Sequence, residues 1–258
     1  MRNLRLTIEY DGTDFYGWQY QPEKRTVQGE IELAIEKITG ENTRIIGAGR
    51  TDHGVHALAQ IANFKTNSDI SCDKLKAGLN ALTGEDIHIK EVKEVPSDFH
   101  ARFSACSKLY QYKIMSQFSP IKRRYYWFVD YKLDLGLMKE ALKYFVGKHD
   151  FRNLSVSNDT DSEDREKNTV CNIFNLSLTE KDIDIIINVE ANRFLRKMVR
   201  GIVGFLVDVG RGRFQPEDAG KIFTGGLNGI YFAPAHGLYL VKVRYEEFLK
   251  GENNGIIS

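Results

Sequence analysis

Apolar and polar residues alternate at the start of the chain and at several later places, and this period of two predicts half-buried β-strands. The clearest case is residues 3–10, where Leu4, Leu6, Ile8 and Tyr10 fall on one face. Further strands are expected over residues 55–65, 87–95, 109–115 and 238–245. A hairpin is expected where residues 172–178 and 183–189 flank the turn Glu180-Lys181-Asp182.

Apolar residues at helical spacing predict helices between these strands. One follows Thr26, a suitable N-cap, and stops at Gly40; the others cover residues 75–82, 137–146, about 193–209 and a short stretch beginning at Pro216. Several neighbouring strands have no helix between them, which favours an α+β fold with mostly antiparallel sheet. We expect an N-terminal lobe over residues 1–104, a C-terminal lobe over 105–245 and a tail over 246–258.

The charge of the chain is balanced overall but unevenly distributed. The 258 residues carry 36 basic and 35 acidic side chains, so the net charge of +1 alone does not indicate a nucleic-acid binder. Residues 100–124 nevertheless contain basic side chains and no acids, and residues 193–213 contain Asp208 as their sole acid. Residues 155–168 are acidic and are predicted to form a surface loop. Such blocks indicate a basic surface.

Composition also indicates where the protein resides. No apolar run approaches the roughly 20 residues that span a bilayer, and the first residues enter a strand without a signal-peptide core. The three cysteines, Cys72, Cys106 and Cys171, lie far apart. This pattern argues against a disulfide framework and predicts a cytoplasmic protein without a membrane partner.

The most unusual segment is Gly47–Ala57, in which small residues crowd Arg50, Asp52, His53 and His56 into a short loop before a strand. An ordinary glycine-rich turn, with Asp52 bonded to local amides, explains it about as well as a functional site. A metal site formed by Asp52, His53 and His56 is a weaker alternative, because no other cluster completes a ligand set. A P-loop is excluded, since no Gly-Lys-Ser/Thr follows.

Two other segments combine charge or aromatic rings with a regular element. On the expected helix 193–209, a basic stripe carries Arg193, Arg196, Lys197 and Arg200. Gly201 and Gly204 continue it as a bare surface with no evident packing role. This stripe suits a phosphate backbone or a carboxylate. Tyr110 and Tyr112 share one face of the expected strand 109–115, where core packing is the commoner role and base stacking the alternative.

Together these pieces resemble the tRNA pseudouridine synthase A family over about residues 3–245. The resemblance rests on segments in the family's order: Ile8–Gln19, Val27–Glu32, Gly49–Ala57, His100–Ala105 with Tyr110–Tyr112, Phe194–Arg200 and Ala235–Leu240. It implies isomerisation of uridine to pseudouridine in the anticodon stem-loop of tRNAs, typically at positions 38, 39 and 40, without a cofactor or metal. It also implies a two-lobed fold with a basic cleft between the lobes and a homodimer that shares the tRNA.

The resemblance assigns the site residues. Asp52 is expected to be the catalytic nucleophile or base, Arg200 its charged partner, and Tyr110 a ring that stacks on the target base and can move a proton. Arg50 helps to extrude the nucleotide, and Leu238 packs on the base. Phosphate contacts are expected from Arg193, Arg196 and Lys197, together with the basic run 122–124.

Two alternatives stay open from the sequence. The first is a non-catalytic tRNA-binding protein or chaperone, which the intact Arg50-Thr51-Asp52 argues against. The second is a metal-dependent RNA hydrolase that uses Asp52, His53 and His56.

Overall fold

The computed structural model describes residues 1–156 and 168–246, and the chain divides into two compact units. Unit 1 comprises residues 1–108 and the described residues from Tyr239 on, and unit 2 comprises residues 109–238. The last strand therefore belongs with the N-terminal part of the chain, whereas the sequence placed it in the C-terminal lobe. The expected acidic loop 155–168 and the tail lie largely outside the described residues.

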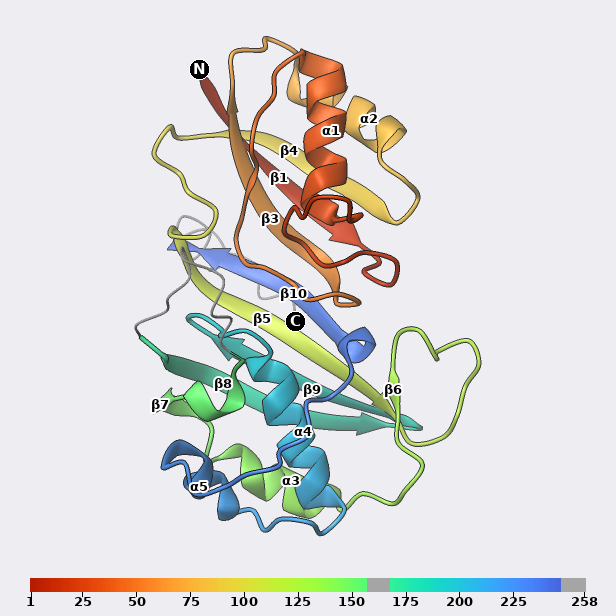
Figure 1. Ribbon diagram of the computed structural model, residues 1–258, viewed down its shortest axis with the longest axis vertical. Helices are drawn as coiled ribbons and strands as arrows, with labels where there is room; N and C mark the ends of the chain where they lie inside the picture. Colours follow the sequence, from red (N-terminus) through yellow and green to blue (C-terminus); the bar gives the residue numbers. More distant parts are fainter. Residues whose placement is uncertain (157–167, 247–258) are drawn as a thin grey trace, which may run out of the picture. The chain divides into compact units, whose positions relative to one another are not determined.

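Unit 1 contains an antiparallel sheet in which β1 (Arg2–Tyr10) lies between β4 (Ile87–Val95) and β3 (His56–Thr66). The short β2 (Ile46–Gly47) pairs antiparallel with β3, and β10 (Leu238–Tyr245) pairs parallel to it, with Tyr239 opposite His56. Helices α1 (Val27–Thr39) and α2 (Cys72–Leu82) pack beside each other on this sheet (Figure 1). The predicted strands and helices of this unit are confirmed, with small shifts at their ends.

Alternation and capping explain these elements. Leu4, Leu6 and Ile8 on β1 are buried, as are Ile31 and Ile35 on α1, and together they form the core of unit 1. The Thr26 side chain accepts a hydrogen bond from the backbone amide of Gly29, so it satisfies one of the unpaired donors at the start of α1.

Unit 2 is built on a second set of strands in the order β5, β9, β8, β7. The elements are β5 (Ala105–Met115), which enters unit 2 at Leu109, β7 (Gly147–Asp150), β8 (Val170–Lys181) and β9 (Asp184–Ala191), and β6 (Trp127–Phe128) runs parallel to the end of β5. The predicted hairpin is confirmed as the antiparallel pair β8 and β9, whose turn places Asp182 at φ 54°.

The helices of unit 2 are α3 (Leu135–Leu142), α4 (Met198–Gly210) and α5 (Asp218–Phe223), with 3₁₀ turns η1 (Arg152–Leu154) and η2 (Ala235–Gly237). Helix α3 ends before the predicted residue 146, because the chain turns and buries Phe145 against the rings of Phe205 and Phe223. Nearly every residue of α4 is buried, so this helix is the centre of the core.

The prediction of one helix over residues 193–209 is wrong at its start. Lys197 has φ 62° and ψ 2°, a left-handed conformation in which an α-helix does not continue, and α4 begins at Met198. Arg193 and Arg196 thus precede the helix in an irregular segment, and the four basic residues do not form a helical stripe.

Gly204 of α4, predicted to lie on a bare surface, is buried. A Cβ atom on this residue would collide with the backbone carbonyl of Tyr231, so the missing side chain lets the segment before β10 cross the helix closely. The glycine therefore has a packing role.

The observed architecture is α+β with mostly antiparallel strand pairs, as predicted. Over the described ranges 1–156 and 168–246, no helix has the length and apolar character needed to cross a membrane.

Candidate functional site

Asp52 lies in unit 1, in the loop that joins β2 to β3, and its side chain is half-buried. Arg50 of the same loop is exposed. A turn closes the loop, since the amide of Val55 donates to the carbonyl oxygen of Asp52 over 3.2 Å. The loop thus presents a carboxylate and a guanidinium two residues apart on a tightly bent backbone.

A second segment, residues 11–18, supports this loop. The amide of Trp18 donates to the carbonyl oxygen of Thr51 over 3.0 Å, and Nδ1 of His53 donates to the carbonyl oxygen of Phe15 over 2.6 Å. Gly17 has φ 91°, and a Cβ atom there would lie 2.6 Å from the Thr51 carbonyl oxygen. The two backbones therefore touch, a contact that only glycine permits at this position.

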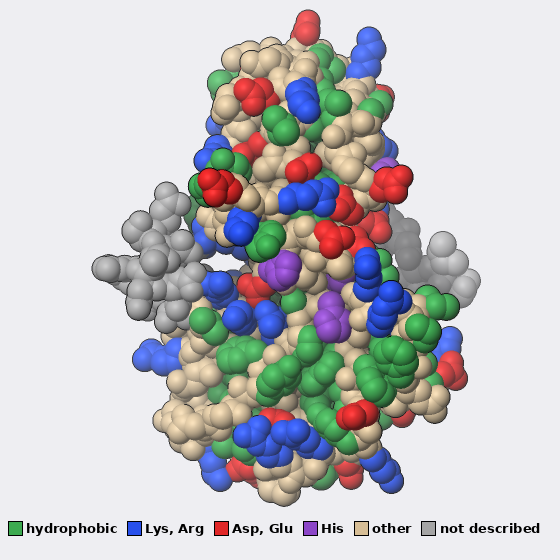
Figure 2. Space-filling model, turned by 45° about the vertical axis from the view of Figure 1, so that its right-hand side comes forward, with side chains coloured by type: hydrophobic (Ala, Val, Ile, Leu, Met, Phe, Trp, Pro, Cys, Tyr) green, Lys and Arg blue, Asp and Glu red, His purple; other side chains and the backbone are tan. Residues whose placement is uncertain are grey.

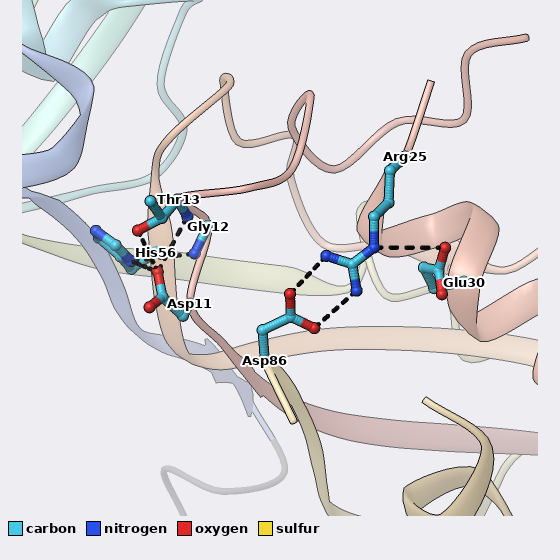
Figure 3. Close-up of polar contacts among 7 residues, drawn as sticks. All are labelled: Asp11, Gly12, Thr13, Arg25, Glu30, His56 and Asp86. Carbon is cyan, nitrogen blue, oxygen red and sulfur yellow. Dashed lines mark hydrogen bonds and ion pairs between the residues drawn. The ribbon is translucent and has the colours of Figure 1, made fainter. Parts of the chain in front are cut away.

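An ion pair holds the residue that binds the supporting segment at Tyr16. Arg25 donates to both carboxylate oxygens of Asp86, over 2.5 and 2.9 Å, and its Nε lies 3.7 Å from Glu30 (Figure 3). The carbonyl oxygen of Arg25 accepts a hydrogen bond from the amide of Tyr16. A bidentate pair of this kind fixes direction as well as charge.

His56 holds the end of the Asp52 loop where the chain enters β3. Its Nδ1 accepts from the amide of Gly12 over 3.1 Å and lies 3.0 Å from Asp11 Oδ1 (Figure 3). The ring is 2% exposed and stacks on Tyr239, with centroids 4.7 Å apart. His56 therefore has a structural role, holding the start of β3 against residues 11–12.

The metal-site alternative requires Asp52, His53 and His56 to converge. Within residues 1–156 and 168–246, no three His, Cys, Asp or Glu side chains form a group that could hold a metal ion. The three residues named in that alternative do not form one.

Tyr110, Arg200 and Leu238 lie in unit 2. Tyr110 is 6% exposed on β5, and its ring meets that of Phe194 at 5.0 Å and an interplanar angle of 80°. Leu238 is also largely buried, at the point where η2 ends and β10 begins. Both side chains are therefore held by packing.

Tyr112, two residues along β5, belongs to the core. Its hydroxyl donates to the carbonyl oxygen of Pro234 over 2.7 Å, and burial raises its pKa well above the ordinary value. Its ring contacts Trp127, whose ring in turn contacts the exposed Tyr231. Hydrophobic side chains also gather on one face of unit 2, in the lower part of Figure 2. The packing interpretation of the tyrosine strand thus holds for Tyr112.

Arg200 lies in the first turn of α4 and is half-buried. Its Nε donates to the carbonyl oxygen of Ala233 over 2.6 Å. Arg200 also interacts electrostatically with His236. Burial lowers the pKa of that imidazole below 6.5, and the positive charge of Arg200 lowers it further. A guanidinium beside a helix N-terminus makes this region attractive to an anion.

The remaining basic residues differ in their surroundings. Arg196 is exposed, and Arg193 and Lys197 are half-buried. Lys122 forms an ion pair with Asp184, with Nζ 2.6 Å from Oδ1 and 2.7 Å from Oδ2, which raises the pKa of the lysine. The charge of Lys122 is therefore balanced within unit 2, while the neighbouring Arg123 and Arg124 are exposed.

Sequence reasoning missed the supporting segment 11–18 as a structural partner of the loop. Its signal is present in the sequence, because Gly12 and Gly17 flank a short stretch without alternation, directly after a strand. Nothing in that spacing tells which other loop these glycines touch.

Comparison with known proteins gives matches along nearly the whole chain. Residues 6–104 and 141–246 match the model of a family described as tRNA pseudouridine synthase. Proteins named tRNA pseudouridine synthase A from Caldicellulosiruptor bescii and Caldicellulosiruptor saccharolyticus are 45% and 46% identical over 249 and 250 residues, covering 95% of this chain and 100% of each relative. A tRNA pseudouridine synthase A 2 from Clostridium perfringens is 44% identical over 250 residues with the same coverage.

Proposed function

Because the chain belongs to the tRNA pseudouridine synthase family, we propose that the carboxylate of Asp52 carries out its reaction, the conversion of uridine to pseudouridine in tRNA. The family match covers the loop of Asp52 and the start of α4, while Tyr110 falls between the two matched ranges and is covered by the full-length relatives.

The chemistry needs a single ionised group. The bond between C1′ of the ribose and N1 of uracil breaks, the base turns, and C1′ is joined to C5, whose proton is lost while N1 regains one. No net hydrolysis or redox change occurs, so the reaction itself calls for no cofactor. A carboxylate can act as nucleophile toward the sugar or the base, or remove a proton from the sugar.

Arg200 is the proposed counterion of this carboxylate. A guanidinium stabilises an anion and orients it through its planar donors. The bond from Nε to Ala233 supports the assignment, because it restricts the side chain of Arg200.

Tyr110 and Leu238 are proposed to hold the target base, and Arg50 to help extrude the nucleotide, since a base inside a stem cannot reach the carboxylate. Tyr110 suits this role because packing against Phe194 restricts its ring. Arg193, Arg196 and Lys197 are proposed phosphate contacts. They would act from the irregular segment before α4.

The finer parts of the proposal concern the substrate and the assembly. We place the target uridines in the anticodon stem-loop, at positions 38, 39 and 40, and we propose a cytoplasmic homodimer. The observation that carries the proposal is the full-length match at about 45% identity together with the motif Gly49–Ala57, in which Asp52 occupies a firmly held loop.

The test is pseudouridine mapping on unmodified tRNA incubated with the wild type and with Asp52→Asn. We expect new pseudouridine at positions 38–40 with the wild type and at least about a 10²–10⁴-fold slower reaction with the variant, at a tRNA affinity within a few-fold. A variant that kept a tenth of the wild-type rate would show that Asp52 is not catalytic. Binding without turnover by the wild type would support the chaperone alternative, and full activity in chelator with no metal in the purified protein would exclude the metal-dependent hydrolase.

A further inference from the structure

A buried hydrogen-bond network lies beneath the loop of Asp52. Tyr10, at the end of β1, is 3% exposed, and its hydroxyl oxygen lies 2.8 Å from Oγ1 of Thr51, which is 7% exposed. Gln60 of β3 is fully buried and is a second hydrogen-bond partner of the Tyr10 hydroxyl. The Nε2 atom of Gln60 also donates to the carbonyl oxygen of Gly49 over 2.8 Å.

The Tyr10 hydroxyl is the centre of this network. Burial raises the pKa of Tyr10, so its hydroxyl stays protonated and can both donate and accept a hydrogen bond. Either hydroxyl of the Tyr10–Thr51 pair can be the donor. The network therefore connects Gln60, Tyr10 and Thr51.

Thr51 is thus held at two points. Its hydroxyl is bonded to Tyr10, and its carbonyl oxygen accepts from the amide of Trp18 over 3.0 Å. Gly17 packs against that same carbonyl and against the backbone of Asp52. Because Thr51 directly precedes Asp52, these contacts set the position from which the Asp52 side chain projects.

Hydroxyl groups are not needed here for packing alone. Valine and phenylalanine have nearly the same shapes as threonine and tyrosine, and replacing both partners of a buried hydrogen bond by apolar groups is often nearly neutral for stability. What the hydrogen bond between the two hydroxyl groups adds is a fixed position of Thr51 relative to Tyr10. A displacement of about 1 Å at a catalytic group can cost on the order of 10²-fold in rate.

We propose that Tyr10 and Thr51 are positioning residues for the isomerisation. Their hydrogen bond fixes the backbone that enters Asp52 without either hydroxyl touching the substrate. This inference rests on the catalytic role assigned to Asp52 under the proposed function.

The test is a double-mutant cycle with Tyr10→Phe and Thr51→Val. We expect each variant to lower kcat about tenfold or more, with KM for tRNA within about twofold. The double variant should be no slower than the slower single variant, because the two changes break the same bond. Thr51→Ser, which keeps the hydroxyl, should restore most of kcat.

Matched controls come from the same unit. Tyr245→Phe removes a buried hydroxyl that donates to the Ala101 carbonyl over 2.7 Å, and Thr83→Val removes one that donates to the Leu79 carbonyl over 2.9 Å. Both should lower Tm by amounts similar to the test variants and leave kcat unchanged.

Three results would overturn the inference: wild-type kcat in both single variants, equal kcat losses in the controls, or a double variant whose loss is the product of the single losses. If Thr51→Val fails to fold, Tyr10→Phe and Thr51→Ser decide the question. A fully active Asp52→Asn variant would contradict the proposed function itself. If Asp52→Asn is inactive while Tyr10→Phe has the wild-type kcat, the proposed function stands and only the positioning role of Tyr10 and Thr51 is contradicted.

Discussion

Arg200 and Ala233 are joined by two hydrogen bonds that run in opposite directions. The Nε atom of Arg200 donates to the Ala233 carbonyl over 2.6 Å, and the amide of Ala233 donates to the Arg200 carbonyl over 3.0 Å. The first turn of α4 is thereby tied to the segment that leads into η2 and Leu238. The Nε atom of the guanidinium is thus held by a backbone carbonyl group, which does not titrate.

Replacing Arg200 by methionine should lower turnover on the order of 10²-fold and lower tRNA affinity much less, because it removes charge stabilisation at the reacting group. Single-turnover rates and filter binding separate the two effects. Normal turnover in the variant would leave Arg200 with a purely structural role.

The same variant should raise the pKa of His236, since burial and then the positive charge of Arg200 lower it, against the hydrogen bond to the Tyr126 carbonyl, which raises it. NMR titration of the imidazole measures this, and Arg200→Lys, which keeps the charge, is the control. In the unfolded chain, His236 takes up a proton near its ordinary pKa of about 6.5, whereas in the folded protein it does so at a lower pH. His236 therefore lowers the free energy of unfolding as the pH falls through about 6.5. An unchanged pKa in Arg200→Met would contradict the electrostatic coupling.

Tyr110→Phe and Tyr110→Ala should differ in kind. Phenylalanine keeps the ring that packs on Phe194 and loses only the hydroxyl, so a slower reaction would indicate proton transfer. Alanine removes the stacking surface as well, which is worth about 1–3 kcal/mol for a stacked base. Wild-type rates in both variants would assign Tyr110 to the core, as for Tyr112.

Affinity for tRNA should fall steeply with salt, although the net charge of the chain is only +1. Each phosphate contact adds about 0.7–0.9 to the slope of log affinity against log salt. Arg196→Gln should therefore weaken all tRNA substrates alike and reduce that slope by about one. Lys37→Gln, on the exposed side of α1, is the control. Equal effects of both changes would show that Arg196 is not a phosphate contact.

Gly204→Ala should destabilise the protein by about 1–3 kcal/mol or more, because the new methyl group meets the Tyr231 backbone. Gly220→Ala, in α5, is the matched control: apart from its own helix backbone and chain neighbours, no described atom lies within 4 Å of the position that its Cβ would take. There the same change should stabilise by about 0.4–1 kcal/mol. Urea denaturation measures both, and a neutral Gly204→Ala would mean that the crossing segment moves aside easily.

Local patterns predicted most of the secondary structure because they act locally. Alternation over residues 3–10 and the Thr26 cap each depend on neighbours within a few residues. The start of α4 was mispredicted because Leu195–Val199 has helical periodicity, whereas Lys197 adopts φ 62°, in the left-handed region. The spacing of apolar residues gives no information about the backbone angle of a single residue.

The site was predictable only as residue types in a motif. The spacing Arg50-Thr51-Asp52 draws attention to a carboxylate, but the residues that hold its loop, Tyr10 through Thr51 and Gln60 through Gly49, come from different strands. In the sequence, Tyr10 and Gln60 are each typical of an ordinary strand residue. Contacts between distant segments carry no local signal, so the network became visible only in the folded chain.

The place of β10 beside β3 also has a consequence for biosynthesis. The ribosome releases His56 and its neighbours long before it makes Tyr239, their partner in the sheet. Until unit 2 has been translated, the edge of β3 that pairs with β10 in the folded protein therefore has no partner at its first residues, while Ala57 can already pair with Tyr10 of β1. An exposed strand edge of this kind pairs readily with other chains, so messages truncated before residue 238 should yield aggregation-prone protein.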